Sequence, residues 1–413
     1  MTARAEPEAD VAIVGAGPAG AALAARLASA GLEVVLLERA PVWRWRAGGV
    51  FASPAAVEAL RRTGLDEATL HRIARPIPAM RVETPGGTTF DLTYGASSGG
   101  APAVGFDRSA LDPALVALAA AAGAQVRTGV AVTAVELAAT ALPNPRDRTR
   151  LTLAGVHGPS RLAVRVVVGA DGPRSIVARA ADVVRPNRLS PRVGLTYHLA
   201  DPRPDAAPIR ARMCLLRDGY VGIAPVPGGR VNIGIVLGAS WNADLARDGA
   251  AATAERVLRS VPATADDATP WRHGAPCDAI AGASPLGGRV ARRAGPGWFL
   301  VGDAAGFLDP FTGEGLHRAL VSAELASGAI RAALRGRAGA AAYERAMRRR
   351  FATKDVLSGL VQAFLARPTL FEYAARRLAA REDVRATMGL VMGDLVPASR
   401  GLDPRFLAAL LAP

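Results

Sequence analysis

The fold is decided by the stretch "DVAIVGAGPAGAALAARLASAGLEVVLLER", residues 10–39. Val11–Val14 is a short apolar run of the kind that forms a buried strand, and Leu32–Leu37 is a second such run. Between them, Ala19–Ala30 is rich in alanine and leucine, which favour a helix that packs closely on a sheet. The order strand, helix, strand predicts a βαβ unit in a parallel sheet, and therefore an α/β fold.

Three glycines follow the first strand with the spacing G-x-G-x-x-G. Gly15 permits the tight turn, Gly17 lets the backbone approach a pyrophosphate, and Gly20 allows the helix to pack closely on the strand. The helix N-terminus stabilises phosphate charge, and Glu38, at the end of the second strand, can accept hydrogen bonds from ribose hydroxyls. The unit predicts a dinucleotide site, with a glycine-rich turn in an ordinary βαβ unit as the alternative. FAD and NAD satisfy it equally.

Two later segments also run from a strand through a small-residue turn into a helix. Residues 166–179, "VVVGADGPRSIVAR", place Asp171 in such a turn. Residues 298–320, "WFLVGDAAGFLDPFTGEGLHRAL", place Asp303 after an apolar run and bracket Glu314 with glycines. Asp171 on its own is equally explained as a helix N-cap. A polar ligand that meets a strand end and a helix start together accounts for the second segment.

Together the three segments resemble the FAD-binding fingerprints of the para-hydroxybenzoate hydroxylase superfamily, and residues 298–320 are similar to those of its geranylgeranyl reductase group. The resemblance extends over most of residues 8–335. It implies a discontinuous Rossmann-type FAD-binding domain, an antiparallel β-sheet that roofs the flavin, and FAD rather than NAD as the bound cofactor.

The resemblance also implies roles for individual residues. Asp303 is expected to hydrogen-bond the ribityl or phosphate region, and the helix that starts near Gly313-Glu314-Gly315 is expected to direct its dipole at the flavin pyrimidine. Arg108 is expected near the cofactor, with a solvated residue ahead of a Ser109 N-cap as the alternative, and the backbone around Val130 is expected beside the adenine. The full set of expected cofactor-binding residues is Gly15, Gly17, Pro18, Ala19, Gly20, Glu38, Arg39, Arg108, Val130, Asp171, Gly302, Asp303, Gly313, Glu314, Gly315 and Leu316.

The predicted organisation has three parts. The FAD-binding domain comprises residues 1–78, 101–185 and 276–335, and a β-rich substrate domain comprises residues 79–100 and 186–275. Within the substrate domain, "MRVETPGGTTFDL" alternates around a Pro-Gly-Gly turn and predicts a hairpin. Four further strands are predicted from "RVGLTYHLA", "IRARMCLL", "GYVGIAPVP" and "RVNIGIVL". Residues 336–413 form a helical C-terminal region, with prolines 368, 397 and 404 as breaks.

Composition excludes several other classes of protein. Lys and Arg total 50 against 36 acidic residues, a net charge of +14, but no basic run carries interleaved aromatics, so nucleic acid is not an expected partner. The only cysteines, Cys214 and Cys277, are too few for a disulfide framework or a zinc site, so no metal site is expected. Acidic rather than basic residues precede the first apolar stretch, which argues against a signal peptide, and we expect a cytoplasmic protein. The basic and apolar stripes of the tail are expected to pack on the core, with a partner or peripheral membrane surface as the alternative.

The chain departs from the reductase pattern at three positions. Tyr220 and Asn232 fit that group's Tyr-x-Trp-x-Phe-Pro…Asn-Val-Gly motif, but Gly222 and Ala224 replace its two aromatics. Ala47 stands where reductase relatives carry the cysteine of a Cys-Gly-Gly-like turn. Smaller residues would enlarge or reshape a substrate cavity, and the missing thiol weakens a direct transfer of reductase chemistry.

Other polar residues leave alternatives open. Arg44 and Arg46 are expected either to contact FAD phosphate, to steer an anionic substrate, or to be solvated beside Trp43 and Trp45. Among the histidines, His198 and His317 are the candidates for acid–base work, although a satisfied packing role is the favoured interpretation for His317. No catalytic residue can be assigned from these patterns.

The predicted function is that of an FAD-dependent oxidoreductase acting on an apolar or aromatic small molecule. Oxygenation, with NAD(P)H as the electron donor, is slightly favoured over hydride transfer to a carbon–carbon double bond, and a flavin-dependent isomerase or cyclase is a third alternative. Because no second G-x-G-x-x-G follows a strand, NAD(P)H must bind transiently, or a separate electron-transfer protein must supply the electrons. Lys354, the only lysine, is expected far from the flavin, which argues against halogenation.

Overall fold

Strand β1 (Glu8–Val14) lies near the centre of an eight-stranded sheet in the computed structural model, between β11 (Gly158–Gly169) and β2 (Val34–Glu38). Both neighbours run parallel to β1, and β20 (Trp298–Leu300) and β8 (Gln125–Thr128) extend the parallel part on either side. The predicted βαβ unit is therefore confirmed. The remaining strands of this sheet are antiparallel additions: β9 (Ala131–Glu136), β10 (Thr149–Gly155) and β19 (Ala294–Gly295). The structure describes residues 8–94, 102–138, 148–156, 158–186, 192–261, 272, 274–307 and 309–411.

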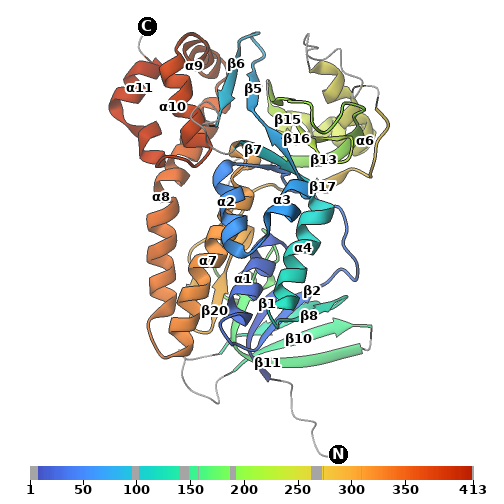
Figure 1. Ribbon diagram of the computed structural model, residues 1–413, viewed down its shortest axis with the longest axis vertical. Coiled ribbons are helices and arrows are strands. Elements are labelled where there is room, and N and C mark those ends of the chain that lie inside the picture. The colour runs from blue at the N-terminus through green and yellow to red at the C-terminus, as the bar shows by residue number, and fades with distance from the viewer. Residues whose placement is uncertain are drawn as a thin grey trace, which may run out of the picture.

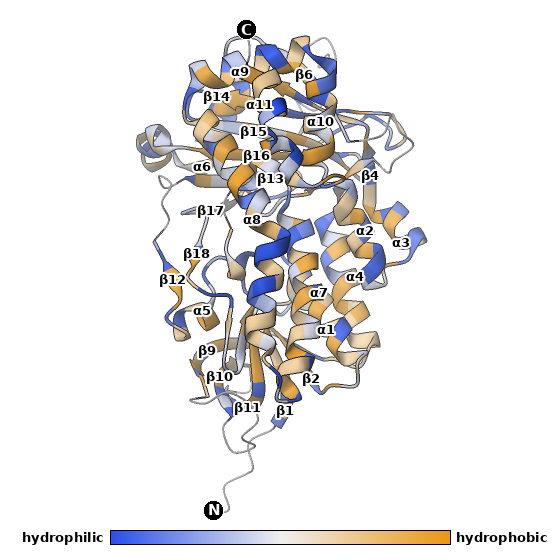
Figure 2. Ribbon diagram, turned by 90° about the vertical axis from the view of Figure 1, so that its left-hand side faces the viewer, coloured by the Kyte–Doolittle hydropathy of each residue, from blue (hydrophilic) through white to orange (hydrophobic). Residues whose placement is uncertain are grey.

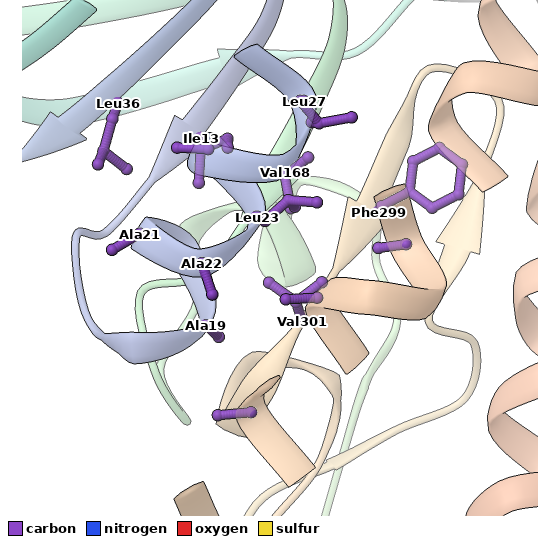
Figure 3. Packing of buried hydrophobic residues seen from close by; sticks show 14 of the residues in the cluster. Ile13, Ala19, Ala21, Ala22, Leu23, Leu27, Leu36, Val168, Phe299 and Val301 are labelled. Carbon is purple, nitrogen blue, oxygen red and sulfur yellow. The ribbon is translucent and has the colours of Figure 1, made fainter. Parts of the chain in front are cut away.

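Three helices form the layer next to this sheet: α1 (Pro18–Ala28), α4 (Arg108–Ala121) and α7 (Gly315–Leu334), with α1 in contact with both of the others (Figure 1). Leu23 and Leu27 of α1 are fully buried, and they share one cluster with Ile13, Val168 and Phe299 (Figure 3). The alanines that fill the rest of α1 let it approach the sheet closely. This core fixes the strand ends and helix starts at which the predicted cofactor residues lie.

A second sheet of seven strands lies above the first (Figure 1). Its order is β17-β13-β16-β15-β14-β5-β6, and the predicted hairpin and all four predicted strands are present. The sheet is antiparallel except for one pair, since β5 runs parallel to β14. These two strands are far apart in the sequence, so no hairpin constrains their direction. The strands are β5 (Ala79–Glu83), β6 (Thr89–Thr93), β13 (Val193–Ala200), β14 (Ala211–Leu216), β15 (Gly219–Val226), β16 (Arg230–Leu237) and β17 (Ala281–Ala283).

The two faces of the seven-stranded sheet have different surroundings. Val221 and Ile223 of β15 point to the face that α6 (Asn242–Ser260) covers, and we call this the outer face. Tyr220, Gly222 and Ala224 alternate with them and point to the opposite face, which we call the inner face. The inner face packs on residues of the C-terminal helices. It also packs on Phe51 and Phe311, which come from two separate segments.

Smaller elements complete the body between the sheets. A three-stranded sheet has the order β3-β7-β4, and a two-stranded sheet pairs β12 with β18. Their bounds, and those of the accompanying helices, are β3 (Phe51–Ala52), β4 (Ala74–Ile77), β7 (Ala103–Phe106), β12 (Val184–Arg185), β18 (Arg289–Val290), α2 (Pro54–Thr63), α3 (Glu67–Ile73) and α5 (Ile176–Ala180).

The C-terminal region is helical, as predicted, and prolines mark its breaks. Helix α8 (Gly339–Leu365) runs along the side of the molecule and leads to α9 (Pro368–Ala380), α10 (Glu382–Met392) and α11 (Pro404–Leu411) beside β6 (Figures 1 and 2). Apolar side chains of these last helices are buried in one cluster with the inner face of the sheet. Within the described ranges, no helix is long and apolar enough to cross a membrane.

Candidate cofactor-binding site

The glycine loop between β1 and α1 shows why each glycine is needed. Gly15 has a φ of +102°, and a Cβ added there would lie 2.5 Å from the carbonyl oxygen of Ala170. A Cβ on Gly20 would lie 2.0 Å from the oxygen of Gly15, so this residue lets the helix pack on the loop. At Gly17, the N-cap of α1, an added Cβ would meet nothing within 4 Å. The packing requirement thus explains two glycines, and the third keeps open the space that a pyrophosphate needs at the start of α1.

Glu38, at the end of β2, presents a fixed carboxylate beside this loop. Its Oε2 accepts a hydrogen bond from Ala16 N at 3.1 Å, and its Oε1 accepts from Ala40 N at 3.0 Å and from Arg46 Nη2 at 2.6 Å. Burial acts to raise the pKa of Glu38, but these hydrogen bonds outweigh burial and lower it. Val130 lies next to it, since its N–H donates to the Glu38 carbonyl at 3.0 Å, whereas Arg39 is exposed.

Asp171 lies in the turn after β11. Its Oδ2 accepts from Ile176 N at 2.7 Å, while the N-cap of α5 is Ser175, whose Oγ accepts from Ala178 N at 3.2 Å. The Oδ1 atom of Asp171 is buried and has no hydrogen-bond partner among the described residues, and burial raises the pKa of this carboxyl. A buried oxygen in that state can accept a hydrogen bond from an ordered water or from a bound ligand.

Asp303 and Arg108 come together from distant parts of the sequence. Burial raises the pKa of Asp303, and the charge of Arg108 acts against that shift, so the two groups are close. Arg108 is not the solvated residue of the alternative interpretation, because it is partly buried and pairs with Asp112 Oδ1 at 2.8 Å. The N-cap of α4 is Asp107, which accepts from Ser109 N at 2.9 Å, and not Ser109.

The Gly313-Glu314-Gly315 turn presents the N-terminus of α7. Gly313 has a φ of +67°, and a Cβ there would lie 2.6 Å from the ring of Phe51. Glu314 is the N-cap residue but its side chain does not cap the helix, and a Cβ on Gly315 would meet nothing within 4 Å. The first backbone N–H groups of α7 have no side-chain cap from Glu314, so they can stabilise negative charge on a ligand at this helix start. Leu316 is buried behind the turn.

The segment that carries Asp303 also touches the glycine loop. A Cβ on Gly302 would lie 2.9 Å from Cβ of Ala19, and Gly302 N donates to Ser322 Oγ of α7 at 2.8 Å. Pro18 occupies the first turn of α1 beside this contact. The predicted residues thus form one continuous row from Glu38 through the glycine loop and Asp303 to the start of α7. We call this row the cradle.

The expectation that Lys354 lies far from the predicted flavin site is wrong. Its Nζ is 3.2 Å from Glu314 Oε1 and 2.9 Å from Asp394 Oδ1, so α8 brings it to the residue that begins α7. The expectation failed because α8 folds back along α7. The sequence shows that Lys354 lies in a helical tail, but not where that helix packs. Distance from the cradle therefore no longer argues against halogenation.

His317 is a satisfied packing residue, as favoured from the sequence. It is buried, its Nδ1 is 2.9 Å from Asp394 Oδ2, and Arg350 lies 3.2 Å from its Nε2. His198, on the inner face, is similarly engaged with Asp278 Oδ2 at 2.6 Å. Both imidazoles thus have Nδ1 engaged by a carboxylate, which fixes the orientation of each ring.

Sequence reasoning missed two polar residues around the cradle. Asp309 accepts from Tyr220 and Arg192, and Asp394 accepts from Lys354. The pairing of Arg46 with Glu38 was not among the roles considered for that arginine. The only signal for Asp309 was its place inside the 298–320 segment. Asp394 has a φ of +58°, an unusual value for a residue other than glycine, but the sequence alone does not reveal it.

The cradle fits FAD on the evidence of its own atoms. Open space beside Gly17 and Gly315, the unpaired Oδ1 of Asp171 and the fixed carboxylate of Glu38 match a ligand that has a diphosphate, a ribose and a ring that gains negative charge on reduction. A parallel sheet with this loop at a helix start defines the class of Rossmann-type dinucleotide-binding proteins. When bound, FAD supplies hydride-transfer chemistry at its flavin ring.

The chain belongs to the FAD binding domain family, whose model matches residues 8–357. Among curated proteins, it is 30% identical over 332 residues to a menaquinone reductase from Mycolicibacterium smegmatis, which covers 77% of this chain and 75% of the relative. It is also 30% identical over 333 residues to digeranylgeranylglycerophospholipid reductase 2 from Methanopyrus kandleri, covering 77% and 76% of the two chains.

Solved structures show the same fold. A flavoprotein/dehydrogenase from Cytophaga hutchinsonii superposes with a TM-score of 0.79 at 19% identity, covering 96% of this chain and 95% of that one. A geranylgeranyl bacteriochlorophyll reductase-like protein from Thermoplasma acidophilum has a TM-score of 0.74 at 21% identity, covering 98% and 96%. The protein is therefore an FAD-dependent oxidoreductase, in one family with the menaquinone and digeranylgeranylglycerophospholipid reductases.

Proposed function

We propose that this protein adds two hydrogen atoms across a carbon–carbon double bond of an isoprenoid lipid. The observation that carries the proposal is the meeting of an apolar sheet face with the start of α7. Tyr220 of the inner face packs edge-on against Phe311, with ring centroids 5.1 Å apart, and Phe311 lies two residues before Gly313. The names of the relatives, a menaquinone reductase and a digeranylgeranylglycerophospholipid reductase, support the same class of substrate.

The inner face has the character that a long apolar substrate needs. Gly222 and Gly234 lie opposite each other in neighbouring strands. A Cβ on Gly222 would find Gly234 O and Met213 Cε as its nearest atoms, both at 3.8 Å, so a methyl group would fit on the inner face at this position with ordinary contacts. The buried side chains that surround this strip on the inner face are Ala211, Met213, Leu215, Tyr220, Ala224 and Val236.

The chain's own residues have three tasks in this reaction. The cradle holds the cofactor, with Glu38 toward a ribose, the loop at Gly17 toward the diphosphate and the start of α7 toward the charged end of the ring. The inner face excludes water from the double bond. Burial raises the pKa of Tyr220 well above its usual range, so its phenol stays protonated and acts as a hydrogen-bond donor. Reduced FAD, when bound, would supply a hydride, and a proton from the solvent would complete the two hydrogens that the substrate gains.

Electrons must reach the cofactor from outside the cradle. We infer that NAD(P)H binds transiently or that a separate protein delivers them, because the described strands carry a single G-x-G-x-x-G loop. Adding NADH or NADPH to the bound FAD distinguishes these two sources. Reduction by either nucleotide supports direct donation, and reduction by neither supports a separate protein.

Oxygenation is the second candidate, and one observation favours it. The turn at Gly48-Gly49 contacts Arg108 of the cradle but carries Ala47 in place of a thiol. Cys214 does not replace that thiol, since it points to the outer face, and Cys277 is exposed. The chain therefore has no thiol at this turn for a reductase mechanism that depends on one.

The test is product analysis under two atmospheres. The full chain loaded with FAD is reduced with one equivalent of dithionite and incubated with geranylgeranyl diphosphate as the probe, either without oxygen or in air. Mass spectrometry of a product that has gained two hydrogens without oxygen supports reduction. A product that forms only in air and has gained an oxygen atom supports oxygenation and rejects the proposal.

A further inference from the structure

A buried carboxylate joins three elements just before α7. Asp309 Oδ1 accepts from the Tyr220 hydroxyl at 2.6 Å and from Phe311 N at 3.0 Å. Its Oδ2 accepts from Arg192 Nη1 at 2.9 Å, and the side chain of Asp309 is only 3% exposed. Arg192 Nη1 also donates to Gln362 Oε1 of α8 at 2.7 Å. We call Asp309, Tyr220 and Arg192 the clamp.

The clamp stands out because its surroundings are apolar. Phe311 packs on the Tyr220 ring, and Leu286 and Val361 belong to the same cluster. Buried polar groups in such a setting are costly unless every one is paired, and hydrogen bonds to a carboxylate are stronger there than in water. The charge of Asp309 is met by Arg192 and its lone pairs are met by two donors, so it holds its partners in one geometry.

The clamp ties together the two surfaces between which the reaction takes place. Asp309 precedes the 3-10 turn Pro310–Thr312, and the chain then passes through Gly313 into α7. Tyr220 projects from the inner face of β15, two residues before Gly222. One bond of 2.6 Å thus links the turn that faces the cofactor to the sheet that faces the substrate.

We propose that Asp309 is a positioning residue, which works through Tyr220 and Arg192 to fix the cofactor-facing turn against the substrate-facing sheet. The cofactor side rests on the family assignment, and the substrate side rests on the proposed function. The clamp takes no part in hydrogen transfer. It sets how the bound ring lies relative to the inner face, and a displacement on the order of 1 Å there costs about 100-fold in rate.

The test uses Tyr220→Phe, which removes one hydroxyl, and Asp309→Asn, which removes the charge that pairs with Arg192. Tyr197→Phe is the matched control, because it makes the same change at a buried tyrosine on the outer face of the same sheet. The full chain loaded with FAD is measured by visible circular dichroism, which reports the environment of the bound ring, and then by kcat and KM. Thermal unfolding is recorded for each variant.

Both clamp variants are expected to change the visible circular dichroism and to lower kcat about 10-fold to 100-fold, with a smaller change in KM. The control is expected to match the wild type. Lower thermal stability with an unchanged spectrum and kcat would show a merely structural role and would overturn the proposal, as would an equal effect in the control. A wild-type protein that reduces no lipid would contradict the proposed function. The visible circular dichroism needs no substrate, so it would still test the role of the clamp.

Discussion

Lys354 Nζ lies 3.2 Å from Glu314 Oε1, although the two residues are 40 positions apart and occupy different helices. The same ammonium lies 2.9 Å from Asp394 Oδ1 and donates to the Val391 carbonyl at 2.7 Å. All three side chains are largely buried. The only lysine of the chain therefore lies between two buried carboxylates near the start of α7, and it joins the C-terminal helices to the cradle.

Replacing that lysine should be strongly destabilising. Lys354→Met leaves Glu314 and Asp394 buried without their cation, which costs about 3–5 kcal/mol for a broken buried pair. Urea unfolding followed by circular dichroism measures the effect. Arg348→Met on the same helix is the control, because Arg348 is exposed and should change the free energy of unfolding little. Equal stability of the two variants would contradict this role of Lys354.

Asp394 should govern part of the acid stability. Burial acts to raise its pKa, but the hydrogen bond from His317 and the charge of Lys354 lower it to about 2. Because the folded-state pKa lies below the unfolded value, this carboxylate stabilises the fold fully above pH ~4 and loses its contribution as the pH falls toward ~2.

The stability difference between wild type and Asp394→Asn should accordingly shrink over that pH interval, by about 2 kcal/mol. Asp383→Asn, at an exposed position in α10, serves as the control. A difference that is constant from pH 6 to pH 2 would show that Asp394 is not ionised in the folded protein.

Two glycines of the same loop should respond differently to alanine. Gly20→Ala places a methyl group 2.0 Å from the Gly15 carbonyl oxygen and should destabilise the apoprotein by about 3 kcal/mol or more. Gly17→Ala meets no protein atom, so the apoprotein should remain stable while FAD binding weakens about tenfold or more. Denaturant unfolding of the apoprotein and titration with FAD measure the two effects. Undiminished FAD affinity in Gly17→Ala would place the diphosphate elsewhere.

Asp303 should contribute to cofactor retention. Its carboxylate has no hydrogen bond within the described ranges and lies close to Arg108, so a bound cofactor is its expected donor. Asp303→Ala should lose about 1.5–3 kcal/mol of FAD binding, which fluorescence titration measures. Asp383→Ala again provides an exposed control. Unchanged affinity would remove Asp303 from the cradle.

The cradle could be predicted from the sequence because its signals are local. Glycine spacing, strand ends and helix starts are properties of short segments, and Gly15, Gly17 and Gly20 have the environments that their spacing indicates. The strands of the second sheet were predictable from alternation and turn residues. The parallel pair of β5 with β14 was not, because nothing in either strand specifies a partner distant in sequence.

Contacts between distant segments were the part that could not be predicted. Lys354 reaches Glu314, and Asp309 reaches Tyr220, only because α8 folds along α7 and the inner face lies above the turn before α7. A buried ion pair leaves no pattern in either of its two segments. The function was predictable to the level of the cofactor and no further, since the choice between hydrogenation and oxygenation depends on the shape of the inner face.

The most direct test of the central claim is the oxidative half-reaction in the absence of oxygen. Protein-bound FAD is reduced with one equivalent of dithionite, mixed anaerobically with geranylgeranyl diphosphate, and followed by the return of oxidised-flavin absorbance. We predict that absorbance returns without oxygen, in proportion to the lipid that has gained two hydrogens. Absorbance that stays low until air is admitted, with an oxygenated product or with no product, would contradict the claim.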